Sequence, residues 1–224
     1  MMEKQGAAMF VWTNIASDAE DQMNEWYSRD HLEERISIVG FVRVRRFIAI
    51  DASRKYLAFY EMLNTRVMIG ADYLASINNP RPTTIAMVRK FRDTARVISH
   101  VRQRAGDDGG ILATVTIEVT RQNRPALDDT LARFDVAPLA LRPGVVGAGL
   151  MEEDADISSR RNAGKDLRTT EDGRADWILV VEGIDRAAVV GACDAFLNQV
   201  RLPSPNVTER SLYRFLSGKN AFNP

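Results

Sequence analysis

Cysteine is almost absent from this sequence: among its 224 residues, only Cys193 carries a thiol. A single cysteine cannot form an internal disulfide, and it offers no C-x-x-C pair of the kind that holds structural zinc. We therefore expect a chain that folds in a reducing compartment, which favours a cytoplasmic location.

Net charge and long apolar runs are also missing. Lys plus Arg and Asp plus Glu each total 30, so the formal net charge is zero and no long-range field attracts a polyanion. Nowhere do about eighteen apolar residues follow one another, and Met1–Ala8 lacks the basic and apolar regions of a signal peptide. Neither nucleic acid nor membrane is expected as a partner.

The common motifs of nucleotide, metal and serine-hydrolase sites are absent as well. The sequence contains no G-x-G-x-x-G, P-loop, H-E-x-x-H, C-x-x-C-H or G-x-S-x-G pattern. The sequence therefore gives no motif-based indication of a nucleotide, metal or serine-hydrolase mechanism, and we expect no metal and no cofactor.

The first half of the chain, residues 1–106, has the element order βαββαβ. Hydrophobic periodicity, with turn and breaker residues between the periodic segments, sets the boundaries. The predicted elements are a strand over 7–15, a helix over 23–38, strands over 41–50 and 56–63, a helix over 65–77, a short helix over about 83–92 and a strand over 95–101. This is the order of the split βαβ, or ferredoxin-like, unit.

The same order begins again after the linker 107–110, so residues 107–224 form a second half. An offset of 104, which takes Gly40 to Gly144, aligns 10–15 with 114–119 without a gap. Farther on the offset becomes 121, because the second half carries an inserted hairpin loop at about 153–175. That insertion is polar and contains glycine, as expected for a surface loop.

We therefore predict an α+β fold made of two ferredoxin-like βαββαβ repeats in tandem. A sheet with helices on one face needs a cover for its other face, and the second sheet is the nearest cover. Packed in this way, the two repeats would form one intramolecular α/β barrel. The alternative is two unrelated α+β domains whose common order is a coincidence.

The interior of that barrel is expected to hold a small-molecule cavity. Arg43 and Arg45 alternate with an apolar set on their strand, so they should point between the sheets. They correspond to Gly147 and Gly149, whose missing side chains would leave room for a ligand. The expected ligand-binding residues are Trp12, Asn14, Arg43, Arg45, Tyr60, Thr116 and Glu118. Alternatively, both arginines lie at the barrel mouth and pair with Glu118 or Glu61.

Three residues of the first helix are the candidates for catalysis. Tyr27, His31 and Arg35 are four residues apart and share one helix face. His31 can move a proton near neutral pH, Tyr27 can donate a hydrogen bond, and Arg35 can hold an anion. The corresponding positions of the second half hold two leucines and an aspartate, so only one half carries the arrangement. The alternative is a structural histidine satisfied by a nearby carboxylate.

The pattern WY…H…R…GF…RR runs from Trp26 through His31 and Arg35 to the strand that begins at Phe41. It resembles the dimeric α/β-barrel superfamily, in its EthD-like and antibiotic-biosynthesis-monooxygenase-like forms. The resemblance implies two ferredoxin-like units that form one barrel, as a homodimer or a fused chain, with His31 lining the cleft. Members of that superfamily include cofactor-free monooxygenases, isomerases, cyclases and haem enzymes, so the fold alone does not choose an activity.

These observations leave three functions open. The first is a cofactor-independent enzyme of monooxygenase, isomerase or cyclase type, acting on an organic acid or an aromatic or polyketide-like compound with His31 as acid/base. The second is a non-catalytic protein that binds a hydrophobic acid for a degradation pathway. The third is a haem-binding enzyme, for which His100 is a further axial ligand to consider. A homodimer of the fused barrel is also left open.

Overall fold

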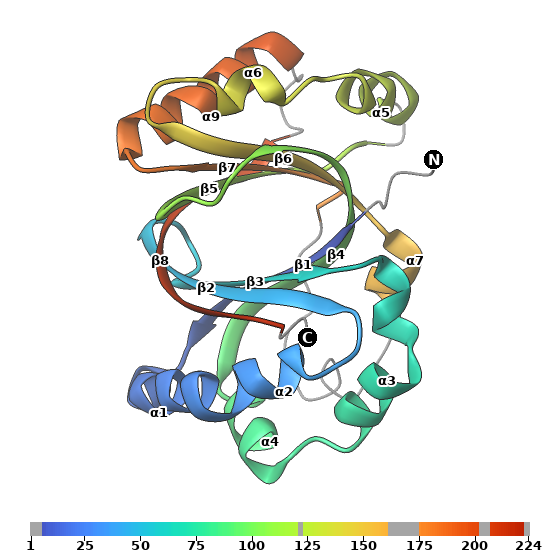
Figure 1. The fold of residues 1–224 in the computed structure, drawn as a ribbon, viewed down its shortest axis with the longest axis vertical. Helices are drawn as coiled ribbons and strands as arrows, with labels where there is room; N and C mark the ends of the chain where they lie inside the picture. Colours follow the sequence, from blue (N-terminus) through green and yellow to red (C-terminus); the bar gives the residue numbers. More distant parts are fainter. Residues whose placement is uncertain (1–5, 121–122, 161–174, 202–206, 222–224) are drawn as a thin grey trace.

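The computed structural model describes residues 6–120, 123–160, 175–201 and 207–221. Two layers of strands lie between two outer layers of helices (Figure 1). The strands of the first half are β1 (Ala7–Ile15), β2 (Phe41–Asp51), β3 (Tyr56–Met62) and β4 (Phe91–Gly106). Those of the second half are β5 (Ile111–Ile117), β6 (Val145–Glu153), β7 (Trp177–Gly183) and β8 (Val207–Asn220).

All these strands close into one barrel in the order β1-β3-β2-β8-β5-β7-β6-β4. The two halves have the same internal order, because β4-β1-β3-β2 is matched by β8-β5-β7-β6. Antiparallel pairing of β2 with β8 and of β4 with β6 joins the halves. The predicted fold class is therefore confirmed, while most of the predicted insertion at 153–175 lies outside the described residues.

The helices of the first half cover the outer face of their sheet. They are η1 (Ser17–Ala19), α1 (Glu20–Trp26), the π turn η2 (Tyr27–His31), α2 (Leu32–Ile36), η3 (Thr65–Ile69), α3 (Ala71–Asn78) and α4 (Pro82–Val88). The segments α1, η2 and α2 follow one another without a break where one helix was predicted. The short helix expected over 83–92 ends earlier, because Phe91 already pairs with Ile15 in the sheet.

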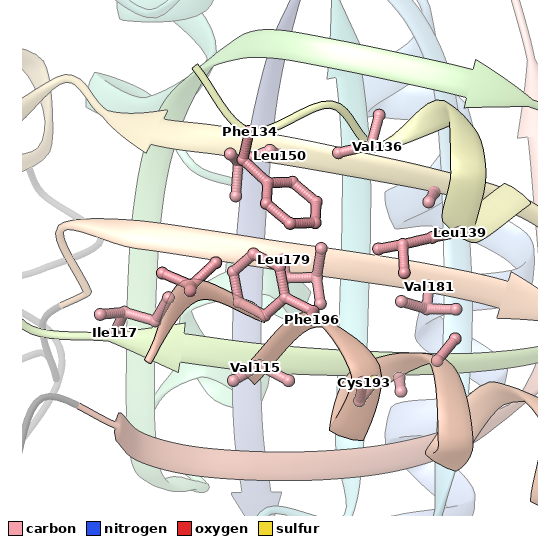
Figure 2. Packing of buried hydrophobic residues seen from close by; sticks show 14 of the residues in the cluster. Val115, Ile117, Phe134, Val136, Leu139, Leu150, Leu179, Val181, Cys193 and Phe196 are labelled. Carbon is pink, nitrogen blue, oxygen red and sulfur yellow. The ribbon is translucent and has the colours of Figure 1, made fainter. Parts of the chain in front are cut away.

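The second half has its own outer layer of helices. These are α5 (Arg124–Ala132), α6 (Ala137–Ala140) and α9 (Arg186–Val200), whereas α7 (Ala155–Ser159) packs on the first half, where Ile157 joins the apolar cluster and the Ile98 amide donates to the Ser158 hydroxyl (Figure 1). Figure 2 shows how Phe134 and Phe196 meet over Leu150 and Leu179 beneath this layer. Across the described ranges, no helix combines the length and apolar character that a membrane crossing needs.

Apolar side chains of both halves pack inside the barrel, while Arg43 and Arg45 line a separate pocket of about 420 Å³ together with the linker residues 108–110, so the cavity expected between the sheets stays a prediction. Phe10 stacks on Phe59 at 4.6 Å and on Trp12 at 5.2 Å between ring centroids, within a cluster drawn from both halves. The space beside Gly147 and Gly149 is occupied. A Cβ on Gly147 would collide with the backbone of the linker, and one on Gly149 would lie 2.9 Å from the Met151 side chain.

A buried ion pair joins the two halves at one end of this interior. The Arg45 guanidinium donates two hydrogen bonds to the Glu182 carboxylate, at 2.6 and 2.9 Å, and both residues are at most 4% exposed. Above it, Arg43 pairs with Glu61 and with Asp108 of the linker. Both arginines point inward as predicted, but carboxylates of the chain already hold them.

We predict that the Arg45–Glu182 ion pair affects the free energy of unfolding mainly when one of its two charges is removed. Glu182→Gln should lower the free energy of unfolding by about 2–3 kcal/mol, because the buried Arg45 loses its bidentate partner and keeps only the longer contacts to Asp108 and Glu61. The double variant Arg45→Met, Glu182→Leu should recover much of that loss. Denaturant unfolding measures both, with Arg133→Gln at the exposed Arg133–Asp129 pair as a control expected to change stability by less than about 1 kcal/mol. A double variant as unstable as the single one would contradict this account.

Candidate functional site

A pocket lies between the helices and the sheet of the first half, on the opposite face of that sheet from the barrel interior. Its volume is about 100 Å³. An engineered apolar cavity of about 150 Å³ holds benzene, so this space is on the scale of one ring. The lining residues are Met9, Val11, Trp26, Tyr27, His31, Arg35, Tyr60, Tyr73, Ile77, Pro80, Thr84, Val88, Phe91 and Arg96.

The π turn η2 determines how the helix presents its histidine. The Leu32 amide donates to the Tyr27 carbonyl, five residues back, and such turns occur often at functional sites. In a regular α-helix, side chains five residues apart are rotated by about 140° around the axis. Here Trp26 and His31 stack with their ring centroids 4.2 Å apart. The wider turn therefore brings the indole and the imidazole onto one face.

Three polar groups surround the His31 imidazole. Arg35 Nε donates to His31 Nε2 at 3.5 Å, and the Tyr60 hydroxyl lies 3.4 Å from the same nitrogen. On the other side of the ring, Nδ1 lies 3.5 Å from Glu34 Oε2. Because Nε2 accepts from an arginine, which can only donate, the proton of the neutral ring belongs on Nδ1, facing the carboxylate.

Burial determines the protonation states in this cluster. Removal from water, with Arg35 nearby, lowers the pKa of His31 to about 4, although Glu34 opposes the change. His31 holds the pKa of Glu34 down, at about 2. Burial raises the pKa of Tyr27 and raises that of Tyr60 further. At neutral pH the site therefore combines a neutral imidazole, an ionised carboxylate and two intact phenols.

Arginines supply the positive charge around the pocket. Arg46 lies with its guanidinium carbon 3.9 Å from the centre of the Tyr27 ring and donates to Asn24 at 2.9 Å. Arg35 donates to Ser76 at 3.3 Å, and its guanidinium lies over the Tyr73 ring. Arg96 donates to the Tyr73 hydroxyl at 3.3 Å. All three arginines are at most 8% exposed.

The structure brings together some of the predicted site residues and separates others. Tyr27, His31 and Arg35 line the pocket together, and Tyr60 joins them from β3. Tyr60 does not face the barrel interior as expected, because alternation along β3 puts Phe59 inside and Tyr60 beneath the helices.

The remaining predicted ligand-binding residues lie away from the pocket. Trp12 belongs to the barrel interior, and Arg43 and Arg45 are ion-paired. Asn14 bonds to Ser53 and Lys55 of the β2–β3 turn. Thr116 donates to the Glu209 carbonyl, and Glu118 is exposed.

Sequence reasoning missed Arg96, Tyr73 and Thr84 as pocket residues, and Arg46 as the cation against the Tyr27 ring. The signal for Arg46 is its place between Val44 and Ile48, the apolar set expected to face the helices. Arg96 gives a similar signal, since it interrupts the apolar stretch 95–98. Tyr73 and Thr84 give no comparable signal, because their positions depend on how α3 and α4 fold back over the sheet.

The corresponding layer of the second half is mainly apolar, although a pocket of about 340 Å³ lies there beside Val115, Asp194 and Arg210. Leu131 and Leu139 stand at the positions that correspond to Tyr27 and Arg35, and both are buried there. Phe134 and Phe196 meet edge to face at 4.9 Å in the same layer (Figure 2). In the part of the chain that the structure describes, no cluster of His, Cys, Asp and Glu side chains could hold a metal ion.

Several solved structures share this fold over nearly their whole length. An anthrone oxidase-like protein matches with a TM-score of 0.66 and 14% identity, over 99% of this chain and 95% of that one. A candidate monooxygenase from Fusobacterium nucleatum subsp. nucleatum ATCC 25586 has a TM-score of 0.60 and 10% identity, over 98% and 96%. A haem-binding protein from Thermus thermophilus has a TM-score of 0.51 and 8% identity, over 95% and 92%.

These similarities establish a dimeric α/β-barrel fold, in agreement with the pattern around His31. Identities this low carry the fold and not the activity. No protein-family model matches the sequence, and no curated protein sequence matches it at a significant level.

We predict that burial of His31 makes stability depend on pH in a defined window. Its pKa is about 4 in the folded chain against an ordinary 6.5, so between these values the unfolded state binds more protons. The free energy of unfolding should fall by up to about 3 kcal/mol as the pH drops through this window. Urea unfolding across the window measures it.

His31→Gln should remove that part of the pH dependence. Glu34 contributes in a lower window, since its folded pKa of about 2 lies below the ordinary 4.5. Its stabilisation is present above the higher value and lost below it. A stability that falls equally in wild type and His31→Gln between pH 6.5 and about 4 would contradict the assignment to His31.

Proposed function

We propose that this protein is a cofactor-independent acid/base enzyme that acts on a small aromatic or polyketide-like compound or organic acid in the pocket beneath α1 and η2. The observation that carries the proposal is the environment of His31. Its imidazole lines the pocket, is neutral at physiological pH, and has a phenol at one nitrogen and a carboxylate at the other.

Each group around His31 has a role in this chemistry. Nε2 takes a proton from an activated C–H or O–H of the substrate, directly or through the Tyr60 hydroxyl. Glu34 orients the ring and stabilises the imidazolium that forms, as a carboxylate does for histidine in other enzymes. The arginines lie where they can stabilise the oxyanion that the substrate becomes. Return of the proton to another atom completes an isomerisation or a cyclisation.

Oxidation is a second outcome of the same proton transfer. An aromatic anion can give electrons directly to dioxygen, as in the conversion of anthrone and dioxygen to anthraquinone and water. The structural similarity to an anthrone oxidase-like protein and to a candidate monooxygenase supports testing this reaction first. The EthD-like pattern around His31 is consistent with the same proposal.

A non-catalytic carrier of a hydrophobic acid is the competing function. It is favoured by the second half, where two leucines stand at the positions that correspond to Tyr27 and Arg35, so the histidine arrangement is present in one half alone of the described chain. The purified protein distinguishes the two, because a carrier binds a compound without changing it.

A haem enzyme fits the residues less well. His31 Nε2 already faces Arg35 and Tyr60 at 3.5 and 3.4 Å, so its lone pair is shared with two polar groups that an axial iron would have to displace. His100 lies 3.3 Å from Asp154 on β4 and does not line the pocket. Purified protein mixed with haem is therefore expected to show no Soret band of a ligated iron.

Deuterium exchange tests the acid/base proposal even before the natural substrate is identified. We expect the protein to accelerate exchange at the acidic carbon of phenylpyruvate or anthrone in D2O, followed by NMR. Native mass spectrometry of protein from its host identifies any co-purifying compound for the same assay. His31→Gln should lower the rate by about 100-fold or more, the usual contribution of a general base.

The other histidine provides the control. His100→Gln should exchange the probes at the wild-type rate, because its ring is outside the pocket. The rate should also stay constant from neutral pH down to about pH 5 and fall as His31 is protonated near its pKa of about 4. Exchange no faster than in buffer with every compound tested, or a wild-type rate in His31→Gln, would overturn the proposal.

A further inference from the structure

Positive charge around the pocket exceeds the negative charge of the protein, because three buried arginines lie around it and Glu34 is the one carboxylate described above beside His31. Arg35, Arg46 and Arg96 are each more than nine-tenths buried, and among residues 6–120, 123–160, 175–201 and 207–221 none of them forms an ion pair with a carboxylate. Burying a charge without a partner is costly. Such charges usually meet an anion that comes from elsewhere.

Two of the three arginines have other compensation. Arg46 is held between the rings of Tyr27 and Tyr56 and donates to Asn24. Arg35 donates to His31 and to Ser76. Cation–π contacts and neutral acceptors offset part of the cost of their burial.

Arg96 has the least compensation. Its Nη2 donates to the Tyr73 hydroxyl, whereas its Nη1 is buried and has no hydrogen-bond partner among the described residues. A guanidinium has five N–H donors and no acceptor, so what is missing is an acceptor atom.

The second half shows the same strand position with its charge paired. Arg96 lies opposite Val11 in the β1–β4 ladder, and Arg210 lies opposite Val115 in the β5–β8 ladder. The offset of 104 takes Val11 to Val115, so the two arginines correspond. Arg210 forms an ion pair with Asp194 of α9 at an exposed site, with the two side chains 45% and 51% exposed, whereas Arg96 is buried. In the first half, Arg96 meets the neutral Tyr73 hydroxyl and no carboxylate of the described residues.

Two further buried polar atoms without partners belong to lining residues of the same pocket. They are Trp26 Nε1 and Thr84 Oγ1. The indole N–H can only donate, and the hydroxyl can donate. The rest of the wall is largely apolar, with Met9, Val11 and Phe91 among its members.

We infer that the ligand of this pocket is a small aromatic anion, whose carboxylate or equivalent oxyanion is held by Arg96. The ring of such a ligand contacts the apolar wall, and its charge takes the place that Asp194 has beside Arg210. This inference rests on the proposed function for the location of the site and goes beyond it by naming the charge of the substrate and a specificity-determining residue.

A matched pair of probes tests the inference. Benzoate and benzamide have the same ring and nearly the same size, and differ in charge. Binding of each is measured by isothermal titration calorimetry in low-salt buffer free of other carboxylates and of phosphate. We expect the wild-type chain to bind benzoate at least about tenfold more tightly than benzamide, as hydrogen bonds to a charged partner imply.

Variants then assign the preference to Arg96. Arg96→Gln should reduce the ratio to near one, and Arg96→Lys should restore part of it, because a lysine keeps the charge without the planar fork. Arg210→Gln is the matched control, since it removes a cation from the corresponding strand position and should leave the ratio unchanged. His31→Gln should also keep the preference for benzoate.

Each outcome decides the inference. Equal binding of the two probes, binding of neither, or an unchanged ratio in Arg96→Gln would overturn it. If the wild-type chain prefers benzoate but does not accelerate proton exchange, the proposed catalysis is rejected and the anion site is retained. If it accelerates exchange through His31 but does not prefer benzoate, the anion site is rejected and the proposed catalysis is retained.

Discussion

Mutual coverage of the two sheets is the constraint on which the rest of the structure depends. Each sheet uses one face for the barrel interior, where Phe10, Phe47 and Phe59 pack against residues of the other half. Charge that enters this interior has to be paired within the chain, as Arg45 is with Glu182. Because much of that face is occupied by packed rings, the helix side of the first sheet is where the pocket around His31 has room.

On the helix side, one local irregularity determines the chemistry. The π turn Tyr27–His31 allows the indole of Trp26 to stack on the imidazole, and this stack helps exclude water from one side of the ring. Exclusion of water is the main cause of the low pKa of His31. A residue that is often charged near neutral pH thus becomes a neutral acceptor, with its lone pair directed at Arg35 and Tyr60. Backbone geometry, burial and protonation state form one causal chain here.

The sequence was sufficient for the fold and for part of the site. Period-two alternation and the offset between Gly40 and Gly144 predict the strand order, because register and hydrophobic pattern are local properties. A bulge between Phe41 and Arg43 then shifts the alternation and puts Phe41 beneath the helices, which no pattern in the strand announces. The partner of Arg45 was missed for a different reason: Glu182 lies 137 residues away. Long-range pairing of charges is decided by the closed barrel, and it removed two arginines from the predicted binding site.

The difference between the halves shows where stability gave way to function. In the second half, the layer between sheet and helices is largely apolar, and its arginine at the strand position of Arg96 is exposed and pairs with Asp194. In the first half the same layer contains three buried arginines, a buried histidine and several buried polar atoms without partners. Such groups cost stability unless something compensates them. The second half has leucines at the positions of Tyr27 and Arg35, so the fold itself does not require polar groups there. The excess of buried positive charge in the first half is the observation on which the proposed anion site rests.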